Sequence, residues 1–160
     1  MSQSDLQKNG VAVHAQLVDD LPPVVGDRVQ LQQVILNLIR NASDAMTSVV
    51  DRTRSLLVKT ERDGPYSVRL TVRDAGVGIN AHTIDKVFDA FYTTKSDGMG
   101  IGLSVSRSII QRHGGSIWAT PNVDGRGTTF AFSIPTDTNV SIDVKPFLPQ
   151  APNAKEAGRL

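Results

Sequence analysis

The chain has 160 residues, which is enough for one domain with its own core. Its 17 Lys and Arg residues nearly balance its 16 Asp and Glu residues, so its charge gives no reason to expect a nucleic-acid or acidic-membrane partner. It contains no cysteine, which excludes a disulfide framework, a cysteine-ligated metal site and a thiol nucleophile. No apolar run approaches the roughly 20 residues that cross a bilayer and residues 1–10 lack the pattern of a signal peptide, so we expect a cytoplasmic location, with any membrane segment in a longer parent protein.

Hydrophobic periodicity and turn residues predict five strands and three helices. The predicted strands are residues 11–18, 55–61, 66–73, 116–121 and 128–135, and the predicted helices are residues 27–50, 83–88 and 103–112. Strands come mostly in adjacent pairs with helices between the pairs, which argues for an α+β fold. We therefore expect a two-layer α/β sandwich with a mainly antiparallel, mixed sheet and helices on one face.

The long predicted helix carries polar residues at the border of its apolar face. At about 100° per residue, one face holds Leu31, Val34, Leu38, Ala42, Ala45 and Val49. Asn37, Asn41 and Asp44 lie together at the edge of this face. Asn suits a helix interior poorly because its amide competes for backbone hydrogen bonds. A solvated face would explain a lone Asn, but beside the motifs below this trio favours contact with a ligand such as hydrated Mg²⁺.

The segment Asp74-Ala-Gly-Val-Gly-Ile79 places a carboxylate at the end of a predicted strand, followed by two glycines. Glycine allows the backbone to turn tightly and to approach a ligand closely. A carboxylate in this place can accept a hydrogen bond from an exocyclic amine such as that of adenine. Taken alone, an ordinary turn between strand and helix is the better interpretation.

The segment Gly98-Met-Gly-Ile-Gly-Leu103 leads directly into the helix at 103–112. Helix N-termini present free N–H groups and the positive end of the helix dipole, which suit phosphate. Lys95 adds a positive charge just upstream, and Thr93 and Thr94 add hydroxyl groups. The glycines also suit a loop that closes over a nucleotide, although a flexible connection before an ordinary helix is the alternative.

The segment Gly125-Arg-Gly-Thr-Thr-Phe130 is a turn that leads into a strand. A plain hairpin turn explains it. Alternatively, a Thr hydroxyl near the start of the strand helps Asp74 to hold a base.

In order, these four segments resemble the N, G1, G2 and G3 boxes of histidine kinase catalytic domains. The N box is Gln33-Val-Ile-Leu-Asn-Leu-Ile-Arg-Asn-Ala42, and Phe88-Asp-Ala-Phe-Tyr-Thr-Thr-Lys95 resembles the F box. Five ordered motifs are far more specific than one glycine pattern. The resemblance implies the Bergerat ATP-binding fold, shared with gyrase-type and Hsp90-type ATPases. The Thr-Thr-Lys form of the F box looks most like the oxygen-sensor and nitrogen-regulator branch.

The resemblance implies a role for each matching residue. At the base, Asp74 accepts from the adenine amino group, Gly76 and Gly78 let the base approach the backbone, Ile79 lines the pocket and Thr128 supports the adenine end. At the phosphates, the implied residues are Asn41 as the Mg²⁺ ligand, Asn37 and Lys95 as catalytic residues, and Thr94, Lys95, Gly98, Gly100, Ile101, Gly102 and Leu103 as the ATP lid. Phe88 and Phe91 anchor this lid.

The implied reaction moves the γ-phosphate of ATP, with Mg²⁺, to a histidine of a separate dimerisation domain. The acceptor histidine of the family is followed by an acidic residue, whereas His14, His82 and His113 are followed by Ala, Thr and Gly. We therefore expect the acceptor to lie outside this chain and the chain alone to be inactive in autophosphorylation. The implied partners are the dimerisation and histidine-phosphotransfer domain of the parent kinase and, indirectly, a response regulator, and the chain itself is expected to be monomeric.

The expected boundaries follow from the extent of the resemblance. Residues 1–10 are expected to be the remnant of a linker from the helical domain, residues 11–135 the ATP-binding catalytic domain, and residues 136–160 a flexible tail or linker. The tail is rich in Pro, Ala and Asn and has little periodicity.

Three alternatives from other functional classes remain. Gly76-Val-Gly-Ile-Asn-Ala81 matches a Rossmann glycine pattern, but the strand before it alternates polar and apolar residues, whereas Rossmann strands are apolar throughout. An ATPase of the same fold needs a base for water, and the ATPase relatives look to carry Glu where this chain has Asn37. A nucleotide-sensing module without kinase output is the third alternative, which an activity assay would separate. The isolated histidines argue against a metal hydrolase.

Overall fold

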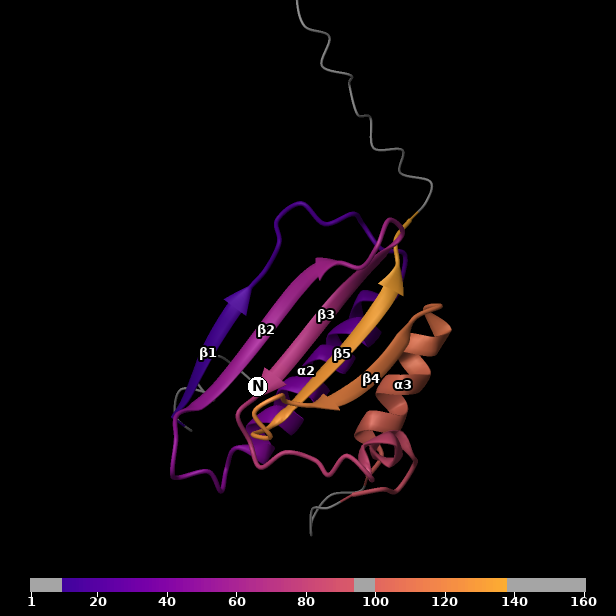
Figure 1. Ribbon diagram of the computed structural model, residues 1–160. Helices are drawn as coiled ribbons and strands as arrows, with labels where there is room; N and C mark the ends of the chain where they lie inside the picture. The colour runs from indigo at the N-terminus through magenta and orange to yellow at the C-terminus, as the bar shows by residue number, and fades with distance from the viewer. Residues whose placement is uncertain (1–9, 94–99, 138–160) are drawn as a thin grey trace, which may run out of the picture.

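Strands form where apolar and polar residues alternate, and all five join one sheet. The computed structural model describes residues 10–93 and 100–137. Its strands are β1 (Val11–Gln16), β2 (Arg54–Arg62), β3 (Ser67–Asp74), β4 (Ser116–Pro121) and β5 (Thr128–Pro135). They lie in the order β1-β2-β3-β5-β4 (Figure 1), with β1 parallel to β2 and the other three pairs antiparallel. The expected mainly antiparallel, mixed sheet is confirmed.

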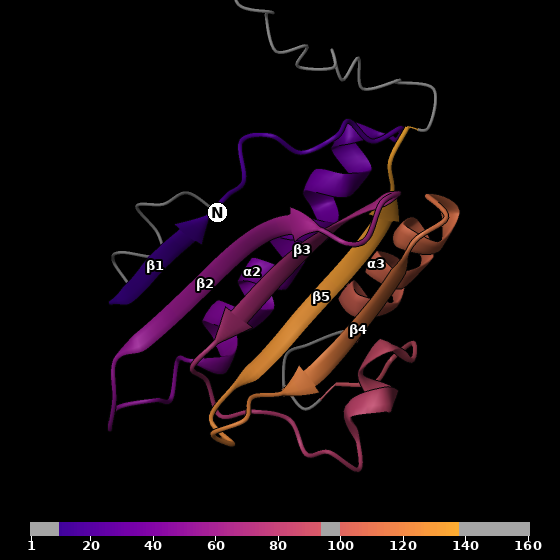
Figure 2. The same ribbon diagram turned by 45° about the horizontal axis from the view of Figure 1, so that its top comes forward.

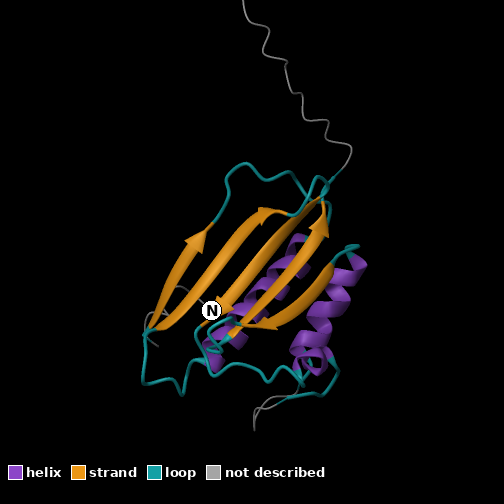
Figure 3. Cartoon of the chain, in the orientation of Figure 1, coloured by secondary structure: helices purple, strands orange, loops and turns teal. Residues whose placement is uncertain are grey.

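The helices α2 (Arg28–Ala45) and α3 (Gly102–Arg112) cover one face of this sheet, and the 3₁₀ helix η1 (Ile84–Phe88) lies near the end of α3 (Figures 2 and 3). The core lies between the two layers. Its fully buried side chains include Val34 and Leu38 from α2, Met46 directly after α2, Ile110 from α3, and Leu56 and Val72 from the sheet. This arrangement confirms the two-layer sandwich with helices on one face. In the described part of the chain, no helix is long and apolar enough to cross a membrane.

Helix α2 begins where the sequence predicts but ends earlier. The Asp27 side chain caps it by accepting hydrogen bonds from the N–H groups of Val29 and Gln30 at 2.8 and 3.0 Å. The prediction extended the helix to residue 50, whereas the structure ends it at Ala45. The following residues Thr-Ser-Val-Val favour helix weakly because they are small and polar or β-branched. The freed carbonyl of Ala45 instead accepts from the N–H of Val77 at 3.1 Å.

His113 ties the far end of α3 to the start of α2. Its Nε2 accepts from the N–H of Asp27 at 3.0 Å, and its Nδ1 lies 2.8 Å from the carbonyl oxygen of Ile109. These partners fit a neutral ring that carries its proton on Nδ1. The histidine therefore has a structural role at the helix terminus.

The pairing of β3 decides which face each of its residues meets. Val72 packs in the core under the helices, so Asp74, two residues later, lies on the same face. Arg73 lies between them and, with its partner Leu57 on β2, faces away from the helices. Strand β3 is antiparallel to both β2 and β5, which excludes the parallel sheet of a Rossmann domain.

Candidate functional site

The Asp74 carboxylate at the end of β3 is the centre of the site. The residue is 2% exposed. One carboxylate oxygen, Oδ1, accepts hydrogen bonds from two backbone N–H groups, that of Gly76 at 2.8 Å and that of Thr128 at 3.2 Å. The two donors come from separate segments, so the start of β5 and the loop after β3 together fix the orientation of the carboxylate.

Position 76 requires glycine because neighbouring atoms lie too close to its backbone to leave room for a side chain. A Cβ at this position would lie 2.7 Å from the carbonyl oxygen of Ala45 and 2.7 Å from Oδ1 of Asp74. The loop after β3 therefore sits directly against the C-terminal end of α2, where Val77 donates to the same Ala45 carbonyl. Any side chain larger than hydrogen would separate the loop from the helix.

The hairpin between β4 and β5 closes the other side of Asp74. Asn122 donates from Nδ2 to the Asp74 carbonyl at 2.8 Å and to the Arg126 carbonyl at 2.7 Å. Gly127 has a φ of 87°, and a Cβ there would lie 2.1 Å from the Asp74 carbonyl oxygen. The hairpin therefore holds the Asp74 main chain, while the start of β5 holds its side chain.

Within the described residues, one oxygen of this carboxylate and one neighbouring hydroxyl have no protein partner. Asp74 Oδ2 and Thr128 Oγ1 make no hydrogen bond within the described residues, although both residues are 2% exposed. Across the same residues, Arg69 Nε is the one fully buried side-chain nitrogen or oxygen without a partner. Oδ2 and Oγ1 are therefore not sealed off, and they provide an acceptor and a hydroxyl for a ligand. The N–H of Thr128 orients Asp74, and the predicted contact of the Thr128 hydroxyl with a base stays a prediction.

Burial raises the pKa of the Asp74 carboxyl above its ordinary value, and the hydrogen bonds from Gly76 and Thr128 lower it in part. The ionised Asp74 carboxylate is thus a hydrogen-bond acceptor in a place where burial makes its charge unfavourable. A ligand N–H donor would offset this cost by giving Oδ2 a hydrogen bond.

The other end of the candidate site lies between α2 and α3. Asn37 donates from Nδ2 to the Ser106 hydroxyl at 3.0 Å, and that hydroxyl donates to the Gly102 carbonyl at 2.9 Å. A Cβ on Gly102 would lie 2.6 Å from Asn37 Oδ1. Asn37 therefore contacts the first turn of α3, beside the predicted phosphate-binding segment. Its catalytic role stays a prediction.

A backbone hydrogen bond joins Phe91 of the F box to Gly100 of the predicted lid. The N–H of Phe91 donates to the carbonyl of Gly100 at 2.9 Å, and both residues have positive φ, 68° and 65°. Phe91 is the one non-glycine residue with positive φ in the described part of the chain. Thr94, Lys95 and Gly98 lie outside the described residues, so their assignment stays a prediction.

The remaining predicted residues lie around these two ends. Asn41 is half-buried on α2, one turn after Asn37. Ile79 and Leu103 are partly buried against the core, and Ile101 is the residue before α3. Gly78, with a φ of 80°, lies against the hairpin glycine Gly127. Their contacts with a nucleotide stay predictions.

The two aromatic residues of the F box differ. Phe88 is buried and packs edge-on against Phe130 with ring centroids 6.2 Å apart, whereas the Phe91 side chain is 77% exposed. Phe88 therefore anchors this region through its side chain, and Phe91 does so through its backbone.

A hollow of about 310 Å³ lies on the other side of the sheet. Its lining includes His14, Leu57 and Arg73, which face away from the helices, together with Arg52 and Arg126. Asp74 and Ala75 also contribute to its wall. This hollow therefore backs onto the Asp74 loop and is separate from the predicted phosphate end.

Sequence reasoning missed three residues that build the site. Arg52 donates to two carbonyl groups of the loop after Asp74, Asn122 holds the Asp74 main chain, and Ser106 joins Asn37 to α3. The available signal for Asn122 was its place directly after β4. Arg52 and Ser106 gave no signal, because their partners are distant in sequence.

Residues 26–138 match the family described as histidine kinase-, DNA gyrase B- and HSP90-like ATPase. The sensor protein FixL of Bradyrhizobium diazoefficiens is 46% identical over 112 residues, which are 70% of this chain and 22% of FixL. The sensor histidine kinase TmoS of Ectopseudomonas mendocina is 39% identical over 130 residues, which are 81% of this chain and 13% of TmoS. The chain therefore spans under a quarter of the length of these two relatives.

Solved structures show the same fold. The catalytic domain of histidine kinase ThkA gives a TM-score of 0.72 at 30% identity, over 84% of this chain and 86% of that domain. ThkA in complex with the response regulator protein TrrA gives a TM-score of 0.70 at 27% identity, over 87% of this chain and 38% of ThkA.

Proposed function

This chain belongs to the family of histidine kinase-, DNA gyrase B- and HSP90-like ATPases, and we propose that it binds ATP with Mg²⁺ and transfers the γ-phosphate to a histidine of a separate dimerisation domain. Its relatives are sensor histidine kinases, and its structural neighbours include a histidine kinase catalytic domain. The observation that carries the proposal is the Asp74 carboxylate, fixed through Oδ1 and left open at Oδ2.

This geometry suits the adenine amino group. Oδ2 accepts one hydrogen bond from an exocyclic N–H, and the Thr128 hydroxyl lies in the same buried surroundings. The base would then sit against the glycine backbone at Gly76 and Gly78. A guanine base presents a carbonyl at the same position, which the carboxylate would repel.

The phosphates would lie toward the N-terminus of α3. No side chain caps this helix in the described residues, so its first N–H groups, at Gly102 and Leu103, are suited to a phosphate oxygen. Lys95 would add a positive charge. Catalysis would consist of positioning and charge neutralisation rather than covalent chemistry.

Asn41 would hold Mg²⁺ through its amide oxygen. In the described part of the chain, no three His, Cys, Asp or Glu side chains gather to hold a metal. This donor set fits Mg²⁺ carried by a nucleotide, because such Mg²⁺ takes its other ligands from phosphate and water. When bound, the metal ion neutralises charge on the phosphates.

The acceptor histidine would come from the parent protein. His113 is held between Asp27 and Ile109, and none of the three histidines precedes an acidic residue. The chain spans 22% of FixL and 13% of TmoS, which leaves room in such a parent for a dimerisation domain. The solved complex of ThkA with a response regulator supports a response regulator as the indirect partner, and we propose a cytoplasmic location for this domain.

Two measurements test the proposal. Calorimetric titration should show binding of ADP with Mg²⁺ and none of NAD, and Asn41→Ala should weaken the part of the affinity that depends on Mg²⁺. With γ-labelled ATP, the chain alone should stay unlabelled and should label a dimerisation domain supplied as a second chain, weakly because the two are not tethered.

Rapid ATP hydrolysis without transfer to any histidine domain would favour the ATPase alternative. The Asn37 amide cannot act as the base that an ATPase needs, and its Nδ2 is bonded to Ser106. Nucleotide binding with neither hydrolysis nor transfer would favour the sensing module.

A further inference from the structure

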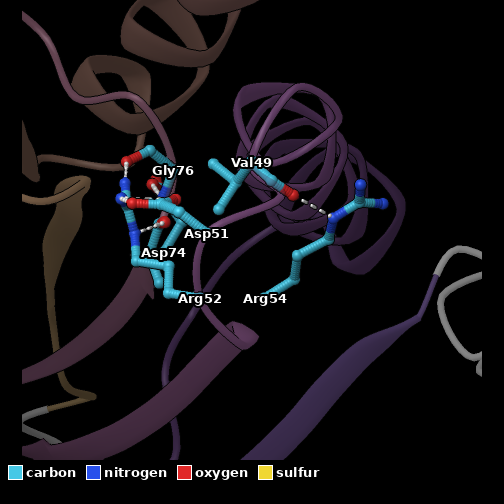
Figure 4. A network of polar contacts seen from close by, with 7 residues as sticks. Val49, Asp51, Arg52, Arg54, Asp74 and Gly76 are labelled. Carbon is cyan, nitrogen blue, oxygen red and sulfur yellow. Dashed lines mark hydrogen bonds and ion pairs between the residues drawn. The ribbon is translucent and has the colours of Figure 1, made fainter.

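The connection between α2 and β2 reaches the site through one side chain. Arg52 donates from Nε to the carbonyl of Ala75 at 3.2 Å and from Nη2 to the carbonyl of Gly76 at 2.9 Å. Figure 4 shows the guanidinium beside Gly76 and Asp74. These two carbonyls belong to consecutive residues directly after Asp74. One guanidinium therefore fixes the loop whose N–H group orients the carboxylate.

The peptide unit between Ala75 and Gly76 links Arg52 to Asp74. Its carbonyl, that of Ala75, accepts from Arg52 Nε at 3.2 Å, and its N–H, that of Gly76, donates to Asp74 Oδ1 at 2.8 Å. Because a peptide unit is planar, holding its carbonyl also restricts its N–H. Arg52 thus restricts the loop rotation that would take the Gly76 N–H away from Oδ1.

The guanidinium is suited to this task. It is planar and presents several N–H donors in a fixed fork, so it can satisfy two adjacent carbonyls at once. Its side chain is 24% exposed, and its Nη1 also pairs with Asp51 at 3.1 Å. Asp51 is 67% exposed, so this pair adds little stability and mainly orients the guanidinium.

We propose that Arg52 is a positioning residue for adenine recognition, acting through the Ala75 and Gly76 carbonyls to aim the Asp74 carboxylate at the base. The proposal rests on the proposed function, because it names how the base-reading carboxylate is held. Arg52 itself does not touch the nucleotide. Its loss weakens the recognition of one functional group, the 6-amino group of adenine.

The neighbouring Arg54 provides a matched control. It donates to the carbonyls of Val49 at 2.9 Å and Thr47 at 3.0 Å, beyond the end of α2. Figure 4 shows the two arginines directed to opposite sides of the same connection. Arg54 therefore binds two carbonyls as Arg52 does, but these carbonyls lie outside the loop after Asp74.

The test compares two nucleotides by calorimetry: ADP and purine riboside 5′-diphosphate, which lacks the 6-amino group. In Arg52→Met we expect affinity for ADP to fall by roughly tenfold to a hundredfold, with affinity for the purine analogue nearly unchanged. Arg54→Met should lower the melting temperature yet keep the parent ratio of the two affinities. Arg52→Lys should recover part of the ratio, because an ammonium group can reach one of the two carbonyls.

A double variant separates positioning from general stability. If Arg52 acts through the carboxylate, Arg52→Met should have little further effect on ADP affinity when combined with Asp74→Asn. If Arg52→Met does not fold, the ratio of the affinities for ADP and the purine analogue is measured in Arg52→Lys and Arg52→Gln instead.

The outcomes distinguish the two proposals. Parent protein that binds neither ADP nor ATP contradicts the proposed function. Parent protein that prefers ADP over the analogue, with the same preference in the folded Arg52 variants, contradicts only the role of Arg52. Equal losses of affinity for both nucleotides assign Arg52 a merely structural role and overturn the inference.

Discussion

Two backbone N–H groups orient the carboxylate at the Asp74 end of the site, whereas the side chains of Asn37 and Ser106 connect α2 to α3 at the other end. At Asp74, two N–H groups, a glycine of positive φ and a guanidinium clamp fix a single carboxylate. At Asn37, one amide and one hydroxyl connect α2 to the first turn of α3. Backbone contacts tolerate little displacement, while side-chain contacts can re-form in new rotamers. The comparison indicates that the proposed base site is preformed and that the proposed phosphate end is adjustable.

The largest expected effect comes from Gly127→Ala. The new Cβ would lie 2.1 Å from the Asp74 carbonyl oxygen, in a residue with a φ of 87°. We expect the free energy of unfolding, measured in denaturant, to fall by about 3 kcal/mol or more. Gly125→Ala is the control, because Gly125 has a φ of 68° but nothing within 4 Å of its Cβ position, so its cost should be about 1 kcal/mol. Equal costs at both positions would mean that the Asp74 end is not tightly packed.

Asp74→Asn should separate binding from stability. We expect ADP affinity to fall about a hundredfold, since the base loses a charged acceptor, while the free energy of unfolding at neutral pH is kept or raised. Calorimetry and denaturant unfolding measure the two effects. A large loss of stability in this variant would show that the carboxylate is structural.

The raised pKa of Asp74 also predicts the direction in which its contribution to stability changes with pH. Because burial raises the pKa of Asp74, the native state holds this proton more tightly than the unfolded state does. The contribution of Asp74 to stability is therefore fully present below its ordinary pKa and is lost as pH rises through the raised pKa. The difference in unfolding free energy between Asp74→Asn and the parent should grow over that range, and a flat difference would contradict it.

At the other end of the site, Ser106→Ala should have a moderate effect. The change removes the hydroxyl between Asn37 and the Gly102 carbonyl, so we expect a loss of about 1 kcal/mol in the free energy of unfolding. Ser108→Ala is the control, because its hydroxyl bonds the Ser104 carbonyl on an exposed face of the same helix and should cost almost nothing. A loss as large as that of Gly127→Ala would remove the contrast between the two ends.

The smallest expected effect is an increase in stability in the variant Phe91→Gly. Phe91 has a φ of 68° and a side chain that is 77% exposed, so Phe91→Gly relieves strain and loses little packing. We expect thermal unfolding to show a gain of about 0.5 to 1 kcal/mol. Val25→Gly is the control: Val25 is 71% exposed and is not among the residues with positive φ, so it should lose stability. Loss of stability in both variants would show that the Phe91 conformation is not strained.

The sequence predicted the elements well where its pattern was local. The bounds of β4 and β5 match the prediction, and α2 begins within one residue of its predicted start. The end of α2 was placed too late, because the apolar face continues through Val49 although the backbone turns after Ala45. Periodicity predicts which side chains are buried and not which backbone conformation they have. Val49 is buried, but it lies in the turn after α2 and not in the helix.

For the site, the sequence could identify Asp74 but not what holds it. The ordered motifs and the family resemblance that they carry predicted Asp74 and Thr128 as residues that meet a ligand. The N–H of Thr128 and the Arg52 clamp involve backbone atoms, which every residue carries, so no residue type marks them. Arg52 and Gly76 are also 24 positions apart, beyond the reach of local patterns.

The end of β3 places Arg73 and Asp74 on opposite faces, and this alternation has a chemical consequence. A slip of one residue in the pairing with β5 would turn every β3 side chain over. The nucleotide would then meet a guanidinium in place of the carboxylate. The apolar pairs that oppose this slip, such as Val72 with Phe130, therefore fix the sign of the charge offered to the base. Under the proposed function, hydrophobic residues that never contact the ligand therefore help to determine ligand specificity, because they fix the register of β3.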